Sequence, residues 1–302
     1  MVYIIEPKQT KQMMKDTNHI FPNDTDNLHE NDSADLFAPV SYFITGFGPF
    51  GEVTENPTSA MIDCLLTEKN AHNPKLRHVH MLEVVRVAAS SATQQVNRMM
   101  ERIMDTPRIN NKERRHGCDD HVVLLHLGVL NHQRRRRRHH NDHGRERTSV
   151  AENNGAHDNQ SMPISFQLEQ NAFNEAHFRI PDNDGWKPTH EQITLDKELG
   201  HRLLTDLNVK RIRDSLIQKG FDVFISGDAG RFLCNYIYWE SLNKLTTAEE
   251  VPIAVDCNLH ALFVHVPSFD CISKDVQVAF VMELIETISE CIACPEEKKG
   301  KH

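Results

Sequence analysis

The stretch "FDVFISGDAGRFLCNYIYW", residues 221–239, joins an apolar run to an aromatic segment through two closely spaced glycines. The run Phe221–Ser226 has the length and the β-branched and aromatic content of a buried strand. The turn Gly227–Gly230 ends this run, and a helix is expected to begin close to Arg231. A strand that turns directly into a helix is the repeating unit of an α/β fold.

The same alternation extends over most of the chain. Five apolar runs have the composition of strands, and amphipathic stretches separate them. The runs are "SYFITGFG" (41–48), "RHVHMLEVV" (77–85), "HVVLLHLGV" (121–129), "FDVFISG" (221–227) and "LFVHVPS" (262–268). Near-continuous apolar strands suit a sheet covered on both faces. The sequence therefore predicts an α/β fold, a three-layer α/β/α single domain with a mostly parallel central sheet.

Three helices are expected between these strands. One begins at Asn56–Pro57, where an N-cap residue precedes proline at the first helical position. Others are predicted over about Leu195–Lys219 and over Lys274–Glu290. The last of these repeats an apolar residue every four positions, which is typical of an amphipathic helix.

Polar segments bound and interrupt the predicted domain, which spans residues 39–292. Residues 1–38 are rich in Asp and Asn without periodicity, and we interpret them as a flexible tail. Residues 293–302 form a second tail. Residues 131–163 are interpreted as a basic loop insertion that contains five consecutive arginines. Because no aromatic residues interleave with these arginines and no ligand spacing appears, neither nucleic acid nor a metal is expected to bind.

Composition excludes several classes of protein. The net charge of -9 over 302 residues gives no electrostatic reason to bind nucleic acid or an anionic membrane. No apolar run approaches the roughly 20 residues that cross a bilayer, and the N-terminus lacks a secretory pattern. Seven scattered cysteines indicate free thiols in a reducing compartment. A cytoplasmic protein without a membrane partner is expected.

Cys234 falls in the opening turn of the helix expected after Gly230. The first N–H groups of a helix lack intrahelical acceptors and carry partial positive charge, so they can stabilise a thiolate or an oxyanion. Ligands of open α/β sheets bind at this carboxyl edge of the strands. However, free cysteine is also among the most buried residue types, and this stretch alone favours a packed side chain.

A nucleophilic cysteine needs a base, and His265 in "LFVHVPS" is the candidate. If its strand neighbours the strand before Cys234, both residues lie near carboxyl ends and can meet. In "ISFQLEQNAFNEAHFRIPDND", Glu169 can orient the imidazole and Arg179 can face developing negative charge. Taken alone, such a histidine is more often a core residue, and Glu169 an ordinary surface carboxylate.

Four motifs in order resemble the pyroglutamyl peptidase I family of cysteine peptidases, also called pyrrolidone-carboxylate peptidases. The cysteine motif has the family's pattern of Ala-Gly, an aromatic residue, an aliphatic residue and Cys-Asn. The motifs are "TGFGPFGEVTENPTSAMI" (45–62), "LEQNAFNEAHFRIPDNDGWKP" (168–188), "SGDAGRFLCNYIYW" (226–239) and "FVHVPS" (263–268).

The resemblance implies an omega peptidase that removes N-terminal pyroglutamate from peptides by acyl transfer, without a cofactor. It implies a catalytic triad of Glu169, Cys234 and His265, with Arg179 beside the reacting carbonyl. An apolar slot with a few main-chain partners suits a flat, uncharged lactam. The residues implied to bind the substrate are Phe47, Phe50, Asn56, Val129 (through its main chain), Phe232 and Leu233. Members of the family are monomers or assemblies, so a homo-oligomer is a possible state.

Three features depart from the family pattern. Gln170 replaces a usually basic residue and Asn171 a usually aliphatic one, and both changes can alter how Glu169 is held. The 131–163 loop is longer than usual, and the spacing between Cys234 and His265 is slightly expanded. Two alternatives remain open: a cysteine hydrolase that acts on another small amide, and a non-catalytic binding protein on the same fold.

Overall fold

The structure is a computed structural model, and the residues it describes are 40–105, 120–130, 164–250 and 257–294. The predicted tail 1–38 and the predicted basic loop 131–163 lie outside these residues. Only Ala293 and Cys294 of the predicted tail 293–302 lie inside them, and Ala293 is the last residue of a helix.

Within the described residues, the core is a six-stranded sheet with the strand order β2-β1-β3-β8-β4-β7. Neighbouring strands are parallel except β4 and β8, which are antiparallel. A separate antiparallel pair is formed by β5 (Asn171–Phe173) and β6 (Arg202–Leu204). The sheet strands are β1 (Val40–Phe47), β2 (Val79–Val85), β3 (Asp120–Val129), β4 (Phe166–Glu169), β7 (Val223–Ser226) and β8 (Cys257–Val266).

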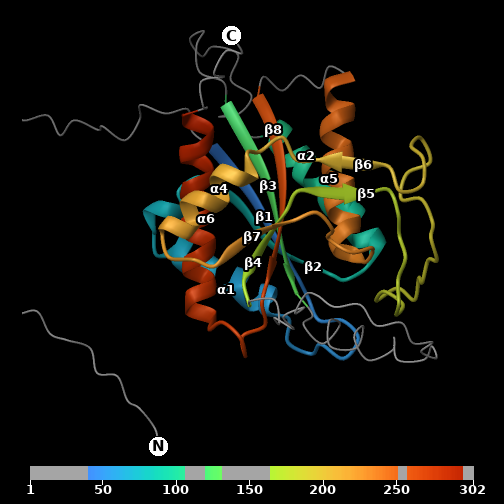
Figure 1. Ribbon diagram of the computed structural model, residues 1–302, viewed down its shortest axis with the longest axis horizontal. Coiled ribbons are helices and arrows are strands. Elements are labelled where there is room, and N and C mark those ends of the chain that lie inside the picture. The colour runs from blue at the N-terminus through green and yellow to red at the C-terminus, as the bar shows by residue number, and fades with distance from the viewer. Residues whose placement is uncertain (1–39, 106–119, 131–163, 251–256, 295–302) are drawn as a thin grey trace, which may run out of the picture. The chain divides into compact units, whose positions relative to one another are not determined.

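Helices cover both faces of this sheet, as Figure 1 shows. Helices α1, α4 and α6 contribute to one hydrophobic cluster, and α2 and α5 contribute to the other. This arrangement confirms the predicted α/β fold with a mostly parallel sheet. The helices are α1 (Pro57–Asn70), α2 (Ala89–Asp105), α4 (Val209–Gln218), α5 (Leu233–Glu250) and α6 (Lys274–Ala293), and a short 3₁₀ helix, η2, spans Pro74–Leu76.

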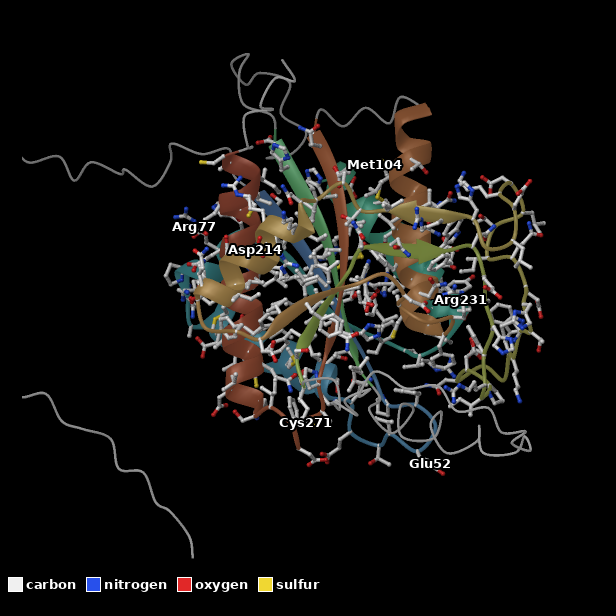
Figure 2. The ribbon with its side chains drawn as sticks, viewed as in Figure 1. Glu52, Arg77, Met104, Asp214, Arg231 and Cys271 are labelled. Atoms are coloured by element: carbon white, nitrogen blue, oxygen red, sulfur yellow. The ribbon has the colours of Figure 1, made fainter. Side chains whose placement is uncertain are left out.

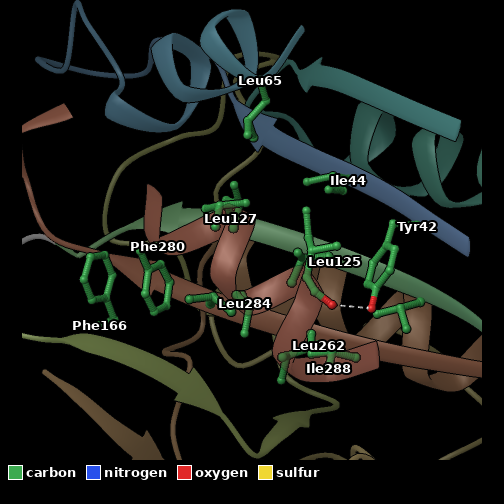
Figure 3. Close-up of a cluster of buried hydrophobic side chains, with 14 of the residues drawn as sticks. Tyr42, Ile44, Leu65, Leu125, Leu127, Phe166, Leu262, Phe280, Leu284 and Ile288 are labelled. Atoms are coloured by element: carbon green, nitrogen blue, oxygen red, sulfur yellow. Dashed lines mark hydrogen bonds between the residues drawn. The ribbon is translucent and has the colours of Figure 1, made fainter. Parts of the chain in front are cut away.

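Strand β3 shows why the central strands are apolar throughout. Leu125 and Leu127 belong to the cluster under α1, α4 and α6, which Figure 3 shows, whereas Val122 and Leu124 belong to the opposite cluster. All four side chains are fully buried. Because successive side chains of a strand point to opposite faces, a strand covered on both sides has no polar face.

The predicted starts of two helices are confirmed. The side chain of Asn56 caps α1 by accepting a hydrogen bond from the Thr58 N–H, and Pro57 is the first helical residue. Helix α6 begins after Ser273, and its buried side chains include Phe280 and Leu284.

The helix predicted over Leu195–Lys219 is wrong in its first half. Only Val209–Gln218 is helical, after Asn208, whose side chain accepts a hydrogen bond from the Arg211 N–H. The preceding residues form a loop and β6, and their carbonyl groups are bound from outside: Asn174 Nδ2 donates to the main-chain oxygens of Thr194, Lys197 and Glu198. This distant side chain replaces the intrahelical hydrogen bonds, and local periodicity does not reveal it.

Candidate active site

Cys234 is the second residue of α5, which begins where the sequence predicted. The turn before it contains Gly230 at φ +85°, a left-handed conformation that glycine adopts without strain. Asp228 braces this turn by accepting a hydrogen bond from the Gly230 N–H. Leu233, the first helical residue, is buried, whereas Cys234 is only half-buried. The sulfur therefore lies near the uncapped amides of the first turn of α5.

The Cys234 sulfur lies against the backbone of β3. A β-carbon added to Gly128 would stand 3.0 Å from this sulfur and 2.6 Å from the Phe263 ring. Such distances are far inside ordinary van der Waals contact, so only glycine admits both neighbours. Gly128 also pairs with His265 across the parallel β3–β8 ladder, which brings the imidazole to the same place.

His265 joins the sulfur to a carboxylate. Its Nδ1 donates a hydrogen bond to Glu169 Oε1 at 2.7 Å, because an ionised carboxylate can only accept. The imidazole also lies within electrostatic reach of the Cys234 sulfur, and because Glu169 engages Nδ1, Nε2 is the nitrogen left to face that sulfur. The structure thus brings together Glu169, Cys234 and His265, the three residues of the expected triad.

The charge state of His265 follows from these neighbours. Burial lowers its pKa, but the charge of the Cys234 sulfur and hydrogen bonds to Cys234 and Glu169 outweigh this and raise the pKa to about 10. The imidazole is therefore protonated at neutral pH, between two acceptors. A protonated imidazole beside a cysteine is the arrangement that activates a nucleophilic cysteine in hydrolases.

Glu169 is fully buried, unlike an ordinary surface carboxylate. It ends β4 and pairs with Phe263 on β8, while Gln167 pairs with His265. Glu169 and His265 are therefore diagonal neighbours on one face of an antiparallel pair, within reach of each other. The single antiparallel contact of the main sheet thus positions this carboxylate.

The two residues after Glu169, which depart from the family pattern, connect its strand to the turn before Cys234. The Gln170 N–H donates to the Ser226 main-chain oxygen at 2.7 Å, and Asn171 Nδ2 donates to that of Gly227 at 3.0 Å. Asn171 is buried. The side-chain amide of Asn171 thus holds the end of β4 against the start of the cysteine turn.

Aromatic rings lie beside the start of α5. Phe50 and Phe232 are half-buried, with ring centroids 5.8 Å apart, and Phe178 meets Phe232 edge to face at 4.7 Å. Trp186 extends the cluster, 5.1 Å from Phe178. Phe47 is buried at the end of β1. Sequence reasoning missed Phe178 and Trp186, although both lie in the quoted glutamate motif and their aromatic character was the available signal.

Asn56 and Val129 lie at the edge of this region. Asn56 Nδ2 donates to the Gly48 main-chain oxygen at 3.0 Å, which fixes the loop that carries Phe50. Because the Leu130 N–H donates to Val266 on β8, the main-chain polar groups of Val129 point to the other side of β3. They lie beyond the last β1–β3 pair, where strand pairing has ended.

The structure does not bring Arg179 to the triad. Its side chain is exposed, and within the described residues it forms no hydrogen bond or ion pair. The neighbouring Ile180 approaches Gly51, so this segment lies beside the loop that carries Phe50. A role for Arg179 at the reacting carbonyl remains a prediction.

A polar network that sequence reasoning missed holds the cysteine turn. Asn235 Oδ1 accepts from the Phe173 N–H at 2.8 Å, and its Nδ2 donates to the Phe173 oxygen at the same distance. Arg231, labelled in Figure 2, binds Glu175 through Nε at 2.8 Å and covers the Phe173 ring at 3.9 Å. This network attaches β5 to the first turn of α5. The adjacent Cys-Asn pair was the available signal.

Neither a metal cluster nor a membrane-spanning helix is found in the described residues. They contain no group of three or more His, Cys, Asp or Glu side chains arranged to hold a metal ion. Within the same ranges, no helix combines the length and apolar character that a membrane span requires.

Comparison with known proteins agrees with this geometry. Residues 159–286, which include all three triad residues, match the family model described as pyroglutamyl peptidase. This part of the chain is similar to the pyroglutamyl peptidase family. A pyrrolidone-carboxylate peptidase of Thermococcus litoralis is 37% identical over 100 residues, and one of Bacillus subtilis is 30% identical over 99 residues.

These alignments cover 33% of this chain and 41% and 42% of the two relatives, so the chain matches about two fifths of their length. The solved structure of the pyrrolidone carboxyl peptidase from Thermococcus litoralis superimposes with a TM-score of 0.57 at 20% identity. It covers 83% of this chain and 94% of that protein. This likeness supports the fold of the pyroglutamyl peptidase family for the larger part of the chain.

Proposed function

We propose that this protein is a cysteine peptidase that removes N-terminal pyroglutamate from peptides. The observation that carries the proposal is the buried chain from Glu169 through His265 to Cys234, at the start of a helix. The family match over residues 159–286 and the names of the relatives supply the substrate class.

The surroundings of Cys234 suit this substrate. Pyroglutamate has no charged α-amine, and its lactam offers one N–H and one C=O. The rings of Phe50 and Phe232 would provide apolar walls, and both pack against the buried cluster that contains Phe47 and Leu233. In this proposal the main-chain groups of Val129 pair with the lactam, and Asn56 holds the loop that carries Phe50.

The first half of the reaction forms an acyl-enzyme. The Cys234 thiolate attacks the carbonyl carbon between pyroglutamate and the next residue, so a C–S bond forms and the oxygen becomes an oxyanion. N–H groups of the first turn of α5 hydrogen-bond this oxygen. The intermediate then collapses, the C–N bond breaks, and Nε2 of protonated His265 gives its proton to the leaving amine. Glu169 stabilises the imidazolium and keeps its ring oriented.

The second half releases the acid. Neutral His265 removes a proton from water, whose oxygen attacks the thioester carbon. The C–S bond then breaks, which frees pyroglutamate and restores the charged pair of Cys234 and His265. These steps need no oxidant or reductant. Arg179 is a candidate for contact with the carbonyl oxygen, and the cytoplasmic location stays a prediction.

A matched pair of substrates tests the proposal. Wild-type protein is mixed with a fluorogenic amide of pyroglutamate and with the same amide of proline, which lacks the lactam C=O and carries a charge. We expect cleavage of the first only, and loss of this cleavage in Cys234→Ser. Cleavage of other small amides but not pyroglutamate would favour the alternative hydrolase. Cleavage of neither, with Cys234 unreactive toward an alkylating reagent, would favour the binding protein.

A further inference from the structure

Tyr238 is a buried polar residue that the proposed reaction does not use. It lies four residues after Cys234 on α5 and is fully buried. Residues four apart on a helix share one face, so the phenol enters the interior on the same side of α5 as the sulfur. Its hydroxyl donates a hydrogen bond to the main-chain oxygen of Glu169 at 2.9 Å.

The aromatic ring of Tyr238 contacts the third element of the site. This ring lies 6.0 Å from the ring of Phe263, two residues before His265 on β8. Tyr238 therefore lies on the helix that carries Cys234, hydrogen-bonds the strand that carries Glu169 and packs against the strand that carries His265.

The carboxylate of Glu169 needs such support because it has few hydrogen-bond partners of its own. It is the last residue of a four-residue strand. Within the described residues its buried Oε2 has no hydrogen-bond partner, and Oε1 is bound to His265. The direction of the carboxylate therefore depends on the position of its own backbone. The bond from Tyr238 fixes that backbone where β4 ends.

We propose that Tyr238 is a positioning residue that acts through its hydroxyl on the backbone of Glu169, so that the carboxylate stays aligned with His265. For turnover this inference rests on the proposed function, but for the reactivity of Cys234 it does not. The hydroxyl is a constant donor, because burial and the charge of Glu169 hold the pKa of Tyr238 above its ordinary range.

The chain offers a matched control for removing this hydroxyl. Tyr42 lies on β1, its side chain is also buried, and its hydroxyl donates to the Ile285 main-chain oxygen at 2.8 Å (Figure 3). It belongs to the hydrophobic cluster on the other face of the sheet. Tyr42→Phe and Tyr238→Phe therefore each remove a buried hydroxyl that donates to a main-chain oxygen. The Tyr42 hydroxyl also bonds to Ser289 Oγ at 2.7 Å, so this control loses at least as much, and only Tyr238→Phe touches an element of the triad.

Two measurements are compared for wild type and both variants. One is kcat and KM with the pyroglutamyl amide, and the other is the rate at which iodoacetamide labels Cys234 as pH is varied, followed by peptide mass. We expect kcat of Tyr238→Phe to fall about five- to tenfold with KM nearly unchanged, the factor that one lost hydrogen bond supplies. The alkylation profile should move to higher pH, because a misaligned carboxylate stabilises the imidazolium less. Tyr42→Phe should match wild type in both.

Unfolding curves show whether both variants fold, and a similar loss of thermal stability in each is compatible with the proposal. Equal kcat and equal alkylation profiles for Tyr238→Phe and Tyr42→Phe would overturn it. If wild type cleaves no pyroglutamyl amide, the proposed function fails, and the alkylation profile alone then decides the role of Tyr238.

Discussion

Nδ1 of His265 and Oε1 of Glu169 lie 2.7 Å apart, although 96 positions separate the two residues in the chain. The antiparallel contact between β4 and β8 creates this proximity. Because His265 also interacts electrostatically with Cys234, the three side chains form one continuous chain of interactions. The first prediction concerns its far end.

Glu169→Gln should lower kcat by about 10²- to 10⁴-fold, because a neutral amide stabilises the imidazolium poorly and its NH₂ group can enforce the wrong tautomer. Kinetics with the pyroglutamyl amide measure this. Glu240→Gln is the control. Glu240 is a second buried carboxylate, but it lies on α5 and accepts a hydrogen bond from Thr93, which is not part of the triad. If both variants lose activity equally, the loss comes from replacing a buried carboxylate and not from the triad.

Gly128→Ala should strongly reduce both activity and the rate of Cys234 alkylation. The new methyl group would stand 3.0 Å from the sulfur, so either the sulfur or β3 must move. Overpacking of this kind typically costs about 1–3 kcal/mol in the free energy of unfolding.

Gly227→Ala provides the comparison for this substitution. The nearest atom to its added methyl group, Oδ1 of Asn171, lies at an ordinary 3.8 Å. We expect this variant to keep most of its activity. Full activity of Gly128→Ala would show that the sulfur does not need its place against β3.

Phe232→Leu should raise KM for the pyroglutamyl amide by a factor of about 5 to 10 and should lower kcat by a smaller factor. The ring meets Phe50 and Phe178, and aromatic contacts of this type contribute about 0.5–1.5 kcal/mol beyond buried area. Phe221→Leu is the matched change on the other face, where the ring meets Phe166. An unchanged KM in Phe232→Leu would remove Phe232 from the substrate site.

The fold could be predicted because its signals are local. The strand runs, the Asn56–Pro57 helix start and the turn before α5 depend on neighbouring residues, and all are confirmed. The failed helix over Leu195–Lys219 depends on Asn174, whose side chain binds carbonyl groups about 20 positions away. Helix propensity and hydrophobic periodicity depend only on nearby residues, so they cannot predict such a contact.

The candidate triad could be named from resemblance, but its supports could not. Nothing in the local sequence indicates that the hydroxyl of Tyr238 binds the backbone of Glu169, or that Gly128 makes room for the Cys234 sulfur. Both relationships arise from strand order, because β3, β8 and β4 are neighbours in the sheet. Arg179 shows the opposite case, since its expected role rests on the motif and the structure leaves it exposed.

A buried polar bridge gives a prediction about acid stability. His126 on β3 is hydrogen-bonded to Thr45 on β1 at 2.7 Å and to Ser241 on α5 at 2.8 Å. Burial lowers the pKa of His126 from 6.5 to about 3. The unfolded chain therefore binds a proton below about pH 6.5 that the folded chain does not bind. This contribution to stability is complete above that pH and is lost progressively as the pH falls toward 3.

Urea unfolding of wild type and His126→Gln, at about pH 7.5 and about pH 5, measures this effect. The variant should be less stable than wild type at both pH values. On going from the higher to the lower pH, its free energy of unfolding should fall less than that of wild type, by up to about 1.4 kcal/mol per pH unit. His72→Asn, an exposed control at φ +60°, should keep the wild-type dependence. An equal loss in His126→Gln and wild type would show that His126 does not titrate as described.

The most direct test of the central claim is the mass of the intact protein, quenched with acid during turnover of a pyroglutamyl ester. A covalent reaction at Cys234 predicts that wild type gains one pyroglutamyl group, that peptide mapping places it on Cys234, and that Cys234→Ser gains none. Turnover without any adduct on wild type, or an adduct that maps to another cysteine, would contradict it.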